Sequence, residues 1–398
     1  MGLKILQITP AYKPAYIYGG PTMSVAQLCE TLVQIGVNLH VLTTTANGAK
    51  ELNVVPNTAL LVDGVKVTYY ERITKDHTHF SPALLRALKQ SIKAHISVSK
   101  TDTKPQINCI IHIHAWWNLV SIFSCSLAKF YNIPVVLSPR GMLTAYSLTN
   151  KNSFVKSTIH KLIGKKLLQY CHIHVTSEKE KADVLDLISP KSITVIPNLV
   201  SLLPIESPSL HKQSNPFKLI YLSRIEEKKG LELLFESLTN LPFEWQLTIA
   251  GSGNDAYLSA LKMLAENLGI SDRLFWIGQV KKENKFNLLL QQDLTTLTSK
   301  NENFANVVIE SLHVGTPVLL SDQVGLANYV LEKQLGWVTV LDAVEIRNSI
   351  IDAFEDKLKR QAIKKMAPAI IAKDFSPTVL AKQYHSLYHR LINETGQN

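Results

Sequence analysis

Cysteine is scarce in this sequence, and no two cysteines stand at the CxxC spacing of a thiol metal site or redox pair. The four that occur are widely separated: Cys29, Cys109, Cys125 and Cys171. A disulfide framework needs more cysteines in a shorter chain, so a disulfide-stabilised secreted scaffold is excluded. We interpret the four thiols as reduced and buried side chains of a cytoplasmic protein.

Glycine and proline are also sparse, with 17 of each in 398 residues, while 46% of the residues are apolar and 19% are charged. This composition excludes collagen-like and intrinsically disordered chains. The length exceeds what one ordinary hydrophobic core needs and suits two domains of about 150–200 residues each.

Long apolar runs are missing as well. Lys4 and Gln7 interrupt the apolar residues at the amino terminus, so no signal peptide is expected. Residues 105–128 carry no formal charge, but histidines, asparagines and serines interrupt them. A buried strand followed by a buried helix is therefore favoured over a membrane span.

Acidic residues are absent from positions 103–177, although this segment contains eight lysines and arginines. The whole chain has 42 Lys and Arg against 32 Asp and Glu, a formal charge of +10. Such a balance favours anionic partners: nucleic acid, an acidic membrane surface or phosphorylated small molecules. Nucleic acid is not expected, because no RNA-binding or zinc-finger pattern accompanies the charge.

Residues 151–170 place apolar side chains at helical spacing with lysines on the flanks. This pattern is typical of a basic amphipathic helix that binds the anionic inner face of a membrane. It is equally typical of a surface helix whose apolar side packs inward, and the sequence leaves both interpretations open.

Short β-branched runs alternate with helical segments along the chain, which predicts parallel sheets covered by helices on both faces. The expected strands are 4–9, 38–44, 65–70, 109–114, 134–138, 172–176 and 192–196, then 217–222, 246–250, 274–277, 294–298, 317–321 and 337–338. A Ser- and Pro-rich segment separates the two series.

We therefore predict two Rossmann-like α/β domains, 1–200 and 216–375, joined by a linker at 201–215. A carboxyl-terminal helix within 376–398 is expected to cross back to the first domain. Because ligands bind at the carboxyl ends of parallel strands, the cleft between the domains is the expected site.

Paired glycines, Gly19 and Gly20, follow the first expected strand and precede a helix expected to begin near Thr22. Glycines at a helix amino terminus let backbone N–H groups approach a phosphate closely, although a plain turn explains them too. No GxGxxG fingerprint is present and no acidic residue follows at the dinucleotide spacing, so NAD is disfavoured.

In the second half, YLSRIEEKKGLE follows a strand, and Arg224 and Lys229 bracket its turn. Two cations at a strand-to-helix turn suit a diphosphate. The alternative is a solvated loop in which Glu226 and Glu227 pair with these cations.

The segment TSKNENFANVVIESLHVGTPVLLSD is the most specific in the chain. Glu302 falls in the loop after a strand, and Glu310 falls on a helix expected to begin near Asn306. The amino terminus of a helix offers N–H groups to a phosphate, while a carboxylate one turn further accepts hydrogen bonds from vicinal hydroxyls. Together they suit a ribose and its phosphate.

Six segments, taken in chain order, resemble the retaining glycosyltransferases of family 4, also called glycosyl transferases group 1. They are GGP at 19–21, SPRGML at 138–143, VIPN at 195–198, SRIEEKKG at 223–230, IAGSG at 249–253 and ENFANVVIESLHVGTPV at 302–318. The resemblance covers essentially the whole chain. It implies the GT-B architecture, in which two Rossmann-like domains face each other across a cleft.

The resemblance also assigns roles. Glu310 would bind the ribose of a nucleotide-sugar donor, and Glu302 would bind the donor sugar. The backbone of the loop before the helix would hold the sugar hydroxyls, and the first helical N–H groups would meet the diphosphate. The implied donor-binding residues are Gly19, Gly20, Arg224, Lys229, Val280, Glu302, Asn303, Phe304, Ala305, Asn306, Val307 and Glu310. Ala305 stands where the family most often has glycine.

His114 matches the histidine that similar enzymes direct towards the donor sugar, and with Glu302, Arg224 and Lys229 it completes the implied catalytic set. A core histidine is the alternative. Arg140 would bind an anionic acceptor and Trp116 would stack on its sugar, although large aromatic residues near the end of a strand more often serve packing. The HxH patterns at 112–114 and 172–174 fall within the acid-free segment 103–177, and no thiol pair is present, so no metal site is expected.

The implied reaction is a retaining, metal-independent transfer of a hexose-type sugar to a lipid-linked or polysaccharide acceptor. No carboxylate presents itself as a nucleophile, which favours same-face attack over double displacement. No cofactor is expected, and the protein would be cytoplasmic and peripheral to the inner membrane face. Alternatives are an epimerase acting on a UDP-sugar, which would release no nucleotide, and a catalytically silent nucleotide-sugar-binding subunit at the membrane.

Overall fold

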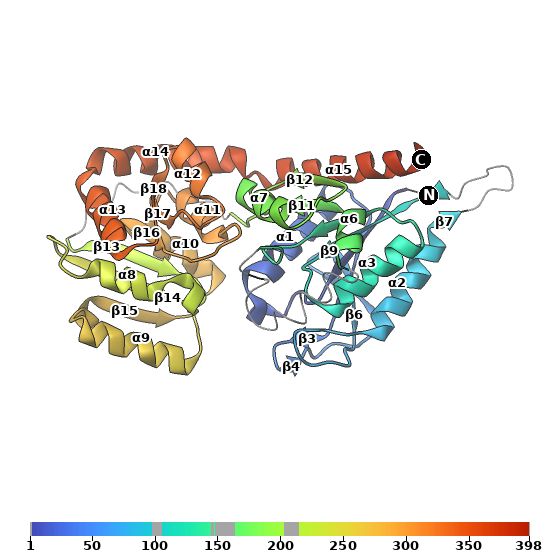
Figure 1. Ribbon diagram of the computed structural model, residues 1–398, viewed down its shortest axis with the longest axis horizontal. Coiled ribbons are helices and arrows are strands. Elements are labelled where there is room, and N and C mark those ends of the chain that lie inside the picture. Colours follow the sequence, from blue (N-terminus) through green and yellow to red (C-terminus); the bar gives the residue numbers. More distant parts are fainter. Residues whose placement is uncertain (1, 98–105, 145–146, 148–163, 203–214, 398) are drawn as a thin grey trace. The chain divides into compact units, whose positions relative to one another are not determined.

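The computed structural model describes residues 2–97, 106–144, 147, 164–202 and 215–397. The chain forms two compact units, the first made of Met1–Leu199 with Pro377–Asn398 and the second of Val200–Ser376. Each unit has a largely parallel sheet with helices on both faces (Figure 1). The two-part α/β fold expected from the alternating pattern is therefore confirmed.

The first unit contains an eight-stranded sheet in the order β12-β11-β10-β9-β1-β2-β6-β5. Its strands are β1 (Lys4–Thr9), β2 (Leu39–Thr44), β5 (Ala59–Val62), β6 (Val65–Tyr70), β9 (Cys109–His114), β10 (Val135–Ser138), β11 (His172–Val175) and β12 (Ser192–Val195). Two short hairpins accompany it: β3 (Ala46–Asn47) with β4 (Lys50–Glu51), and β7 (Ile96–Ser97) with β8 (Gln106–Ile107).

Helices cover both faces of this sheet and bury two apolar clusters. They are α1 (Gly20–Gln34), α2 (Pro82–Ala94), α3 (Leu119–Phe130), α6 (Lys165–Tyr170), α7 (Glu178–Leu187) and α15 (Pro377–Gln397), with the short 3-10 turn η1 (Tyr16–Tyr18). On one face α15 packs with α1, and residues such as Tyr384 and Tyr388 are buried against β1 (Figure 1). On the other face α2 and α3 pack together.

The edge strand β5 was not among the expected strands. It pairs antiparallel with β6 through a tight turn in which Asp63 and Gly64 have positive φ angles of 48° and 80°. Its alternate residues face solvent, and Leu61 is 78% exposed. A strand of four residues with one solvated face lacks the continuous apolar run that reveals a buried parallel strand.

The second unit contains a six-stranded, fully parallel sheet in the order β15-β14-β13-β16-β17-β18. Its strands are β13 (Phe217–Leu222), β14 (Trp245–Ala250), β15 (Leu274–Gly278), β16 (Leu294–Leu297), β17 (Val318–Ser321) and β18 (Gly336–Thr339). Its helices are η3 (Glu227–Lys229), α8 (Leu231–Leu238), α9 (Asp255–Asn267), η4 (Ser271–Arg273), α10 (Lys282–Leu290), α11 (Asn306–His313), α12 (Ala327–Glu332), α13 (Ala343–Glu355) and α14 (Lys357–Asp374).

Each sheet has one point at which the strand order reverses. In the first unit it lies between β1 and β9, and in the second between β13 and β16. At such a point the connections leave to opposite sides, so the loops after the two strands diverge and leave a ligand-binding crevice at their carboxyl ends. Within each unit, the loops after these strands are the place to look for chemistry.

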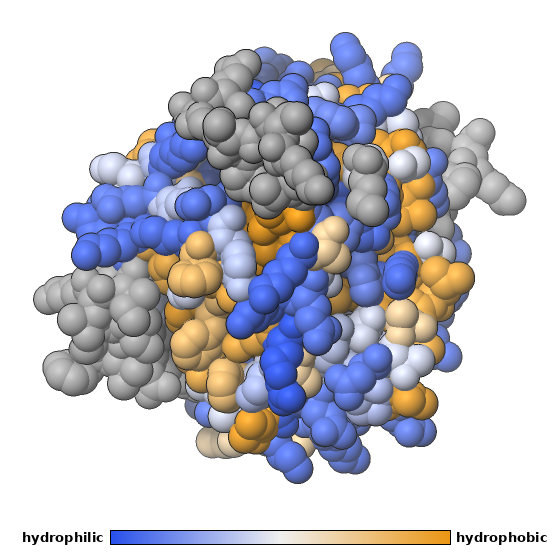
Figure 2. Space-filling view, turned by 90° about the vertical axis from the view of Figure 1, so that its right-hand side faces the viewer, coloured by the Kyte–Doolittle hydropathy of each residue, from blue (hydrophilic) through white to orange (hydrophobic). Residues whose placement is uncertain are grey.

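The basic segment at 151–170 lies mostly outside the described residues, and only its last turns can be assessed. In α6, Lys165 and Lys166 are exposed while Leu167 and Leu168 are buried in the core. For these residues the apolar side packs inward. Figure 2 shows a face on which apolar side chains are interspersed among hydrophilic ones. No helix within the described ranges combines the length and apolar character that crossing a bilayer requires.

Close backbone approach in the second unit depends on Gly230, whose φ is +67°. A Cβ there would lie 2.2 Å from the carbonyl oxygen of Thr298, in the loop after β16. Gly269 has the same φ of +67°, but a Cβ at that position would have no atom within 4 Å, so Gly269 isolates the cost of the backbone angle.

We expect Gly269→Ala to destabilise the second unit by about 1–2 kcal/mol, the cost of a left-handed alanine. Gly230→Ala should add a steric cost of about 1–3 kcal/mol, because backbone must move. Urea unfolding of both variants measures the difference. Equal losses would show that Gly230 is required only for its φ angle.

Candidate functional site

Lys229 and Glu302 meet at the reversal point of the second sheet. Lys229 ends η3 in the loop after β13, and Glu302 lies in the loop after β16. The Lys229 ammonium pairs with the Glu302 carboxylate, with side chains 7% and 21% exposed respectively. The sheet order thus brings together a cation and a carboxylate that are far apart in sequence.

Backbone contacts hold these two loops against each other. The amide of Lys300 donates to the carbonyl of Lys228 at 2.8 Å. The hydroxyl of Thr298 donates to the carbonyl of Gly230 at 3.0 Å. Because both contacts lie close to the ion pair, the Lys229 ammonium is held by backbone geometry as well as by charge.

The Glu302 loop is also fixed on its other side. The Glu302 amide donates to the carbonyl of Gln323 at 3.2 Å, and its carbonyl accepts from the Gly325 amide at 2.8 Å. These two bonds form an isolated parallel bridge with the segment after β17. The carboxylate therefore projects from a loop that is anchored at both edges.

Helix α11 begins immediately after this loop. Ala305 is its N-cap and has a left-handed backbone, with φ +71° and ψ +79°. Phe304 and Ala305 are buried, so the 303–305 segment presents backbone rather than these side chains. The backbone N–H groups of Asn306 and Val307 form the first turn, the part of a helix that attracts anions.

Glu310 lies one turn into α11 and is 8% exposed. Its carboxylate pairs with the ammonium of Lys285 on α10. Sequence reasoning missed Lys285, because nothing in its local pattern shows that α10 packs beside α11. Beyond the oxygen that faces Lys285, the carboxylate has further lone pairs with which it can accept hydrogen bonds.

Arg224 and Val280 are placed less tightly. The Arg224 side chain is 47% exposed and pairs with Glu226 at 2.8 Å, as in the solvated loop that the sequence left open. Val280 follows β15 and is half-buried. Its loop is joined to the end of β14 by a 2.8 Å hydrogen bond from the Gly251 amide to the Gly278 carbonyl.

The first unit places Gly19 and Gly20 after β1, at its own reversal point. Gly19 is the N-cap of α1, with φ +63° and ψ −133°, a conformation that favours glycine. Gly20 is the first helical residue, and apart from its chain neighbours and the backbone of its own helix no atom lies within 4 Å of where its Cβ would stand. The pair therefore forms an uncrowded helix amino terminus.

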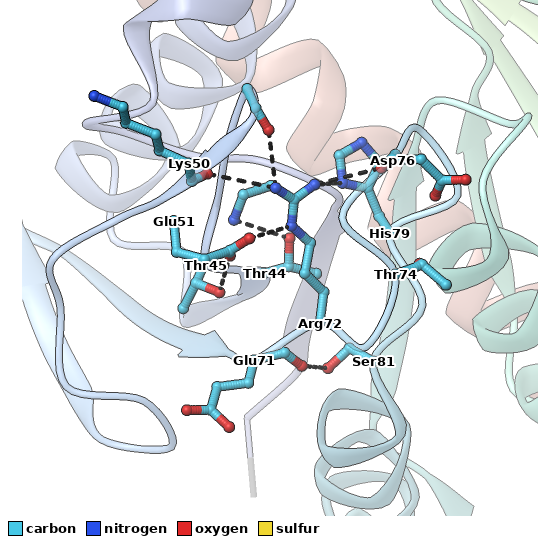
Figure 3. Close-up of polar contacts among 12 residues, drawn as sticks. Thr44, Thr45, Lys50, Glu51, Glu71, Arg72, Thr74, Asp76, His79 and Ser81 are labelled. Carbon is cyan, nitrogen blue, oxygen red and sulfur yellow. Dashed lines mark hydrogen bonds and ion pairs between the residues drawn. The ribbon is translucent and has the colours of Figure 1, made fainter.

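The segment before these glycines contacts loops that a buried arginine, Arg72, joins together, and Figure 3 shows the polar contacts of this arginine. The Arg72 guanidinium donates to the Glu51 carboxylate at 2.9 Å, to the Gly48 carbonyl at 2.9 Å and to His79 Nδ1 at 3.2 Å. Burial, reinforced by Arg72, lowers the pKa of His79 to about 4. The Gly48 amide in turn donates to the hydroxyl of Tyr18 at 2.9 Å. Arg72 thus fixes the loops that contact η1.

His114 and Arg140 are brought together by neighbouring strands. His114 ends β9, and Arg140 follows β10 with a φ of +52°. Arg140 donates from Nε and Nη2 to His114 Nδ1 at 3.4 and 3.3 Å, and from Nη1 to Asn198 Oδ1 at 2.9 Å. Asn198 belongs to the VIPN segment. Burial lowers the pKa of His114 well below its usual range, and His112 and Arg140 add to the effect.

Trp116 corrects an expectation. It is fully buried in the core beside α3. Its ring packs edge-on against that of Trp117, with 6.4 Å between the ring centroids. A ring without exposed area cannot stack on an acceptor, so packing accounts for this tryptophan. Among the described residues, no group of three or more His, Cys, Asp or Glu side chains is arranged to hold a metal ion.

Two family profiles match the chain. One, described as Glycosyltransferase Family 4, matches residues 18–202, and the other, described as Glycosyl transferases group 1, matches residues 204–369. The glycogen synthase of Mycobacterium tuberculosis is 22% identical, over 97% of this chain and 94% of that protein. The D-inositol 3-phosphate glycosyltransferase of Xylanimonas cellulosilytica is 23% identical, over 82% and 83%.

Solved structures share the fold along nearly the whole chain. Sucrose-phosphate synthase from Thermosynechococcus elongatus superposes with a TM-score of 0.74 at 19% identity, covering 98% of this chain and 100% of that one. HepE of Anabaena, in complex with UDP and glucose, gives a TM-score of 0.71 at 18% identity, with the same coverage. At these identities the likeness concerns the fold.

Proposed function

Because this chain belongs to the glycosyltransferases of group 1 and family 4, we propose that it transfers a hexose-type sugar from a nucleoside diphosphate donor to an acceptor hydroxyl, with retention of anomeric configuration. One observation supports this most directly. Lys229, Glu302 and Glu310 are held in the loop after β13, the loop after β16 and the helix that follows it.

In this proposal the second unit binds the donor. Glu310 accepts hydrogen bonds from the two ribose hydroxyls, exchanging part of its pairing with Lys285. The first turn of α11 and Lys229 stabilise the diphosphate. Glu302 and the backbone at 303–305 bind sugar hydroxyls. UDP is the first nucleotide to test, because HepE, which shares the fold, was solved with UDP.

Stabilisation of the departing diphosphate is the main catalytic contribution that we propose. As the bond to the sugar breaks, negative charge grows on the leaving phosphate. A lysine and N–H groups fixed in advance by backbone contacts stabilise that charge without reorganising. Arg224, half exposed and paired only with Glu226 among the ion pairs of the described residues, can add a further positive charge.

Retention by same-face attack agrees with the chemistry of the first unit. The segment 103–177, which contributes β9 and β10, contains no carboxylate to serve as a nucleophile. A donor phosphate oxygen would then accept the proton of the attacking hydroxyl. We propose that Arg140 assists here by binding an anionic group of the acceptor, and that the buried His114 acts through its contact with Arg140. Proton NMR of the first-formed product, whose anomeric coupling reports configuration, tests retention.

The acceptor is proposed as a lipid-linked glycan or a polysaccharide. A lipopolysaccharide core biosynthesis glycosyltransferase of Rhizobium meliloti is 25% identical over 51% of this chain. The two classes are separated by assaying sugar transfer to detergent-solubilised lipid-linked glycans and to soluble polysaccharide.

We further propose that catalysis needs no metal, since Lys229 and the helix N–H groups supply the positive charge that a divalent cation supplies elsewhere. Excess EDTA should leave kcat within about twofold, because no leaving-group charge depends on the metal. The assay is UDP release with and without EDTA, and with MgCl₂ restored. A loss of activity that MgCl₂ reverses would contradict metal independence.

Thermal unfolding with UDP, GDP and ADP tests the donor site. A nucleotide at 100 times its Kd should stabilise the native state by about 2.7 kcal/mol. We expect UDP to raise the midpoint and Glu310→Ala to abolish the rise. The matched control is Glu227→Gln, an exposed carboxylate of the β13 loop, which should keep it. A rise that survives Glu310→Ala would refute the ribose assignment.

A further inference from the structure

A continuous series of buried polar side chains crosses the first unit, and the proposed donor binding does not use it. Its members come from β1, β9, β10 and β11 and from the carboxyl-terminal helix α15, and each is 4% exposed or less. They are Gln7, His112, His114, Ser138, His174 and Tyr388. Such a series has a definite direction if one of its ends can only donate or only accept.

One end is a backbone carbonyl. His174 Nε2 lies 2.8 Å from the carbonyl oxygen of Ile196, which can only accept, so this nitrogen must carry the proton. Burial lowers the pKa of His174 to about 3, so its other nitrogen, Nδ1, is an acceptor. Ser138 Oγ lies 2.6 Å from that Nδ1 and must donate to it.

The direction then passes through His112. Having donated its single proton, Ser138 must accept from His112 Nε2 at 2.7 Å. Burial, together with the nearby His174 and Arg140, lowers the pKa of His112 well below its usual range, so its Nδ1 is an acceptor. The hydroxyl of Tyr388 therefore donates to His112 Nδ1 at 2.8 Å.

The last two steps reach the candidate site. With its proton committed, the Tyr388 oxygen accepts from Gln7 Nε2 at 3.2 Å. This fixes the orientation of the Gln7 amide, whose Oε1 faces His114 Nε2 at 2.7 Å. An amide oxygen can only accept, so His114 Nε2 carries the proton.

We infer that this series fixes His114 as the Nε2–H tautomer and directs its Nδ1 lone pair at Arg140. Gln7 and Tyr388 are thus positioning residues. They act through His114 on the guanidinium, whose other side is held by Asn198. The tautomer follows from contacts within the protein and needs no bound ligand, while its use in catalysis rests on the proposed function. In this arrangement both ring nitrogens of His114 are engaged, so a sugar hydroxyl reaches Nδ1 only by displacing Arg140.

Nitrogen-15 NMR of histidine-labelled protein without any ligand tests the tautomer. His114 is assigned by the signal lost in His114→Gln. We expect His114, His112 and His174 each to show a single neutral species protonated at Nε2. A His114 ring protonated at Nδ1 would overturn the inference. Because no donor is present, failure of UDP to bind leaves this result unaffected.

Variants separate the effect of the buried series on the His114 tautomer from the effect of Arg140. Arg140 also favours an unprotonated Nδ1 in His114, because it donates hydrogen bonds to that nitrogen. In Arg140→Met, the series alone should keep His114 fully in the Nε2–H form. Adding Tyr388→Phe should populate the second tautomer, because the Gln7 amide can then turn over. Adding Tyr384→Phe instead should not. Tyr384 lies one turn away on α15 and contacts His174 Nε2 at 2.9 Å, but that nitrogen keeps the Ile196 carbonyl.

Two results in this set would overturn the inference. One is a mixture of tautomers in Arg140→Met alone, which would assign the control to Arg140. The other is an unchanged His114 signal in Arg140→Met with Tyr388→Phe. If that double variant does not fold, the single variant still decides between the series and Arg140.

Discussion

Replacing Lys229 with methionine should lower kcat by about 10²–10³-fold, the usual effect of removing one preorganised group that stabilises transition-state charge. The ammonium is buried and held beside Glu302. In the variant, neither water nor a surface lysine can supply a positive charge at the same position. UDP release under saturating donor measures the loss. Methionine keeps the length of the apolar stem, so packing around it is largely preserved.

The matched control for this variant is Lys228→Met, the neighbouring residue in the same 3-10 turn. Burial, and then the charge of Lys229, lowers the pKa of Lys228, and its ammonium lies 3.6 Å from Glu226. We expect its kcat to remain within about threefold of the parent, because a weak, partly exposed pair contributes little. Equal losses in the two variants would mean that the turn responds to total charge, and the role of Lys229 would be wrong.

Acidification should destabilise the first unit strongly and the second far less. His112, His114 and His174 have folded pKa values depressed by burial, whereas an unfolded histidine has a pKa of about 6.5. Below that value the unfolded chain binds protons that the folded unit does not. The contribution of these histidines to the free energy of unfolding is therefore highest above about pH 6.5 and falls as the pH decreases below that value.

Between pH 7.5 and 5.5 each of these imidazoles should cost about 1.4 kcal/mol, and the three together about 4 kcal/mol. Other buried histidines of the same unit, whose pKa values burial lowers to about 4, act in the same direction: His40, His79 and His172. Hydrogen exchange of β9 amides, corrected for intrinsic rates, measures the loss, and β13 amides are the internal reference. An equal loss at both strands would contradict the prediction.

The parallel strands could be predicted from the sequence because each is a short β-branched run bounded by turn residues. The expected strands at 4–9, 65–70, 109–114 and 217–222 match the observed bounds. The others differ by one residue at one end or, for 337–338, by one residue at each end. Strand β5 could not be found this way, since it is short, antiparallel and half solvated. Its DG turn was the available signal.

The candidate site was predictable only as separate segments. The sequence indicated a cation at Lys229 and carboxylates at Glu302 and Glu310, since each falls in a loop or helix that follows a strand. It did not indicate Lys285 or Arg72. Both act through partners on other elements, and charged residues in exposed-looking patterns give no sign that packing will bury them.

Trp116 and His114 show the same limit within a single segment. Both residues lie at the end of the strand 109–114 or just after it. For each of them the sequence left two interpretations open, a side chain buried in the core and a side chain that faces a ligand. Packing of α3 buries the tryptophan completely. For the histidine, the deciding contact comes from Gln7 on β1, because the sheet places β1 beside β9.

The sequence by itself therefore determined the alternation of strands and helices, the family and the residue types of the site loops, because these depend on local patterns. Only the tertiary structure decided which charges pair and which way each proton points. The Lys229–Glu302 pair exists because the strand order reverses between β13 and β16. The His114 tautomer depends on Tyr388, whose hydroxyl reaches β9 only when α15 packs against the first sheet.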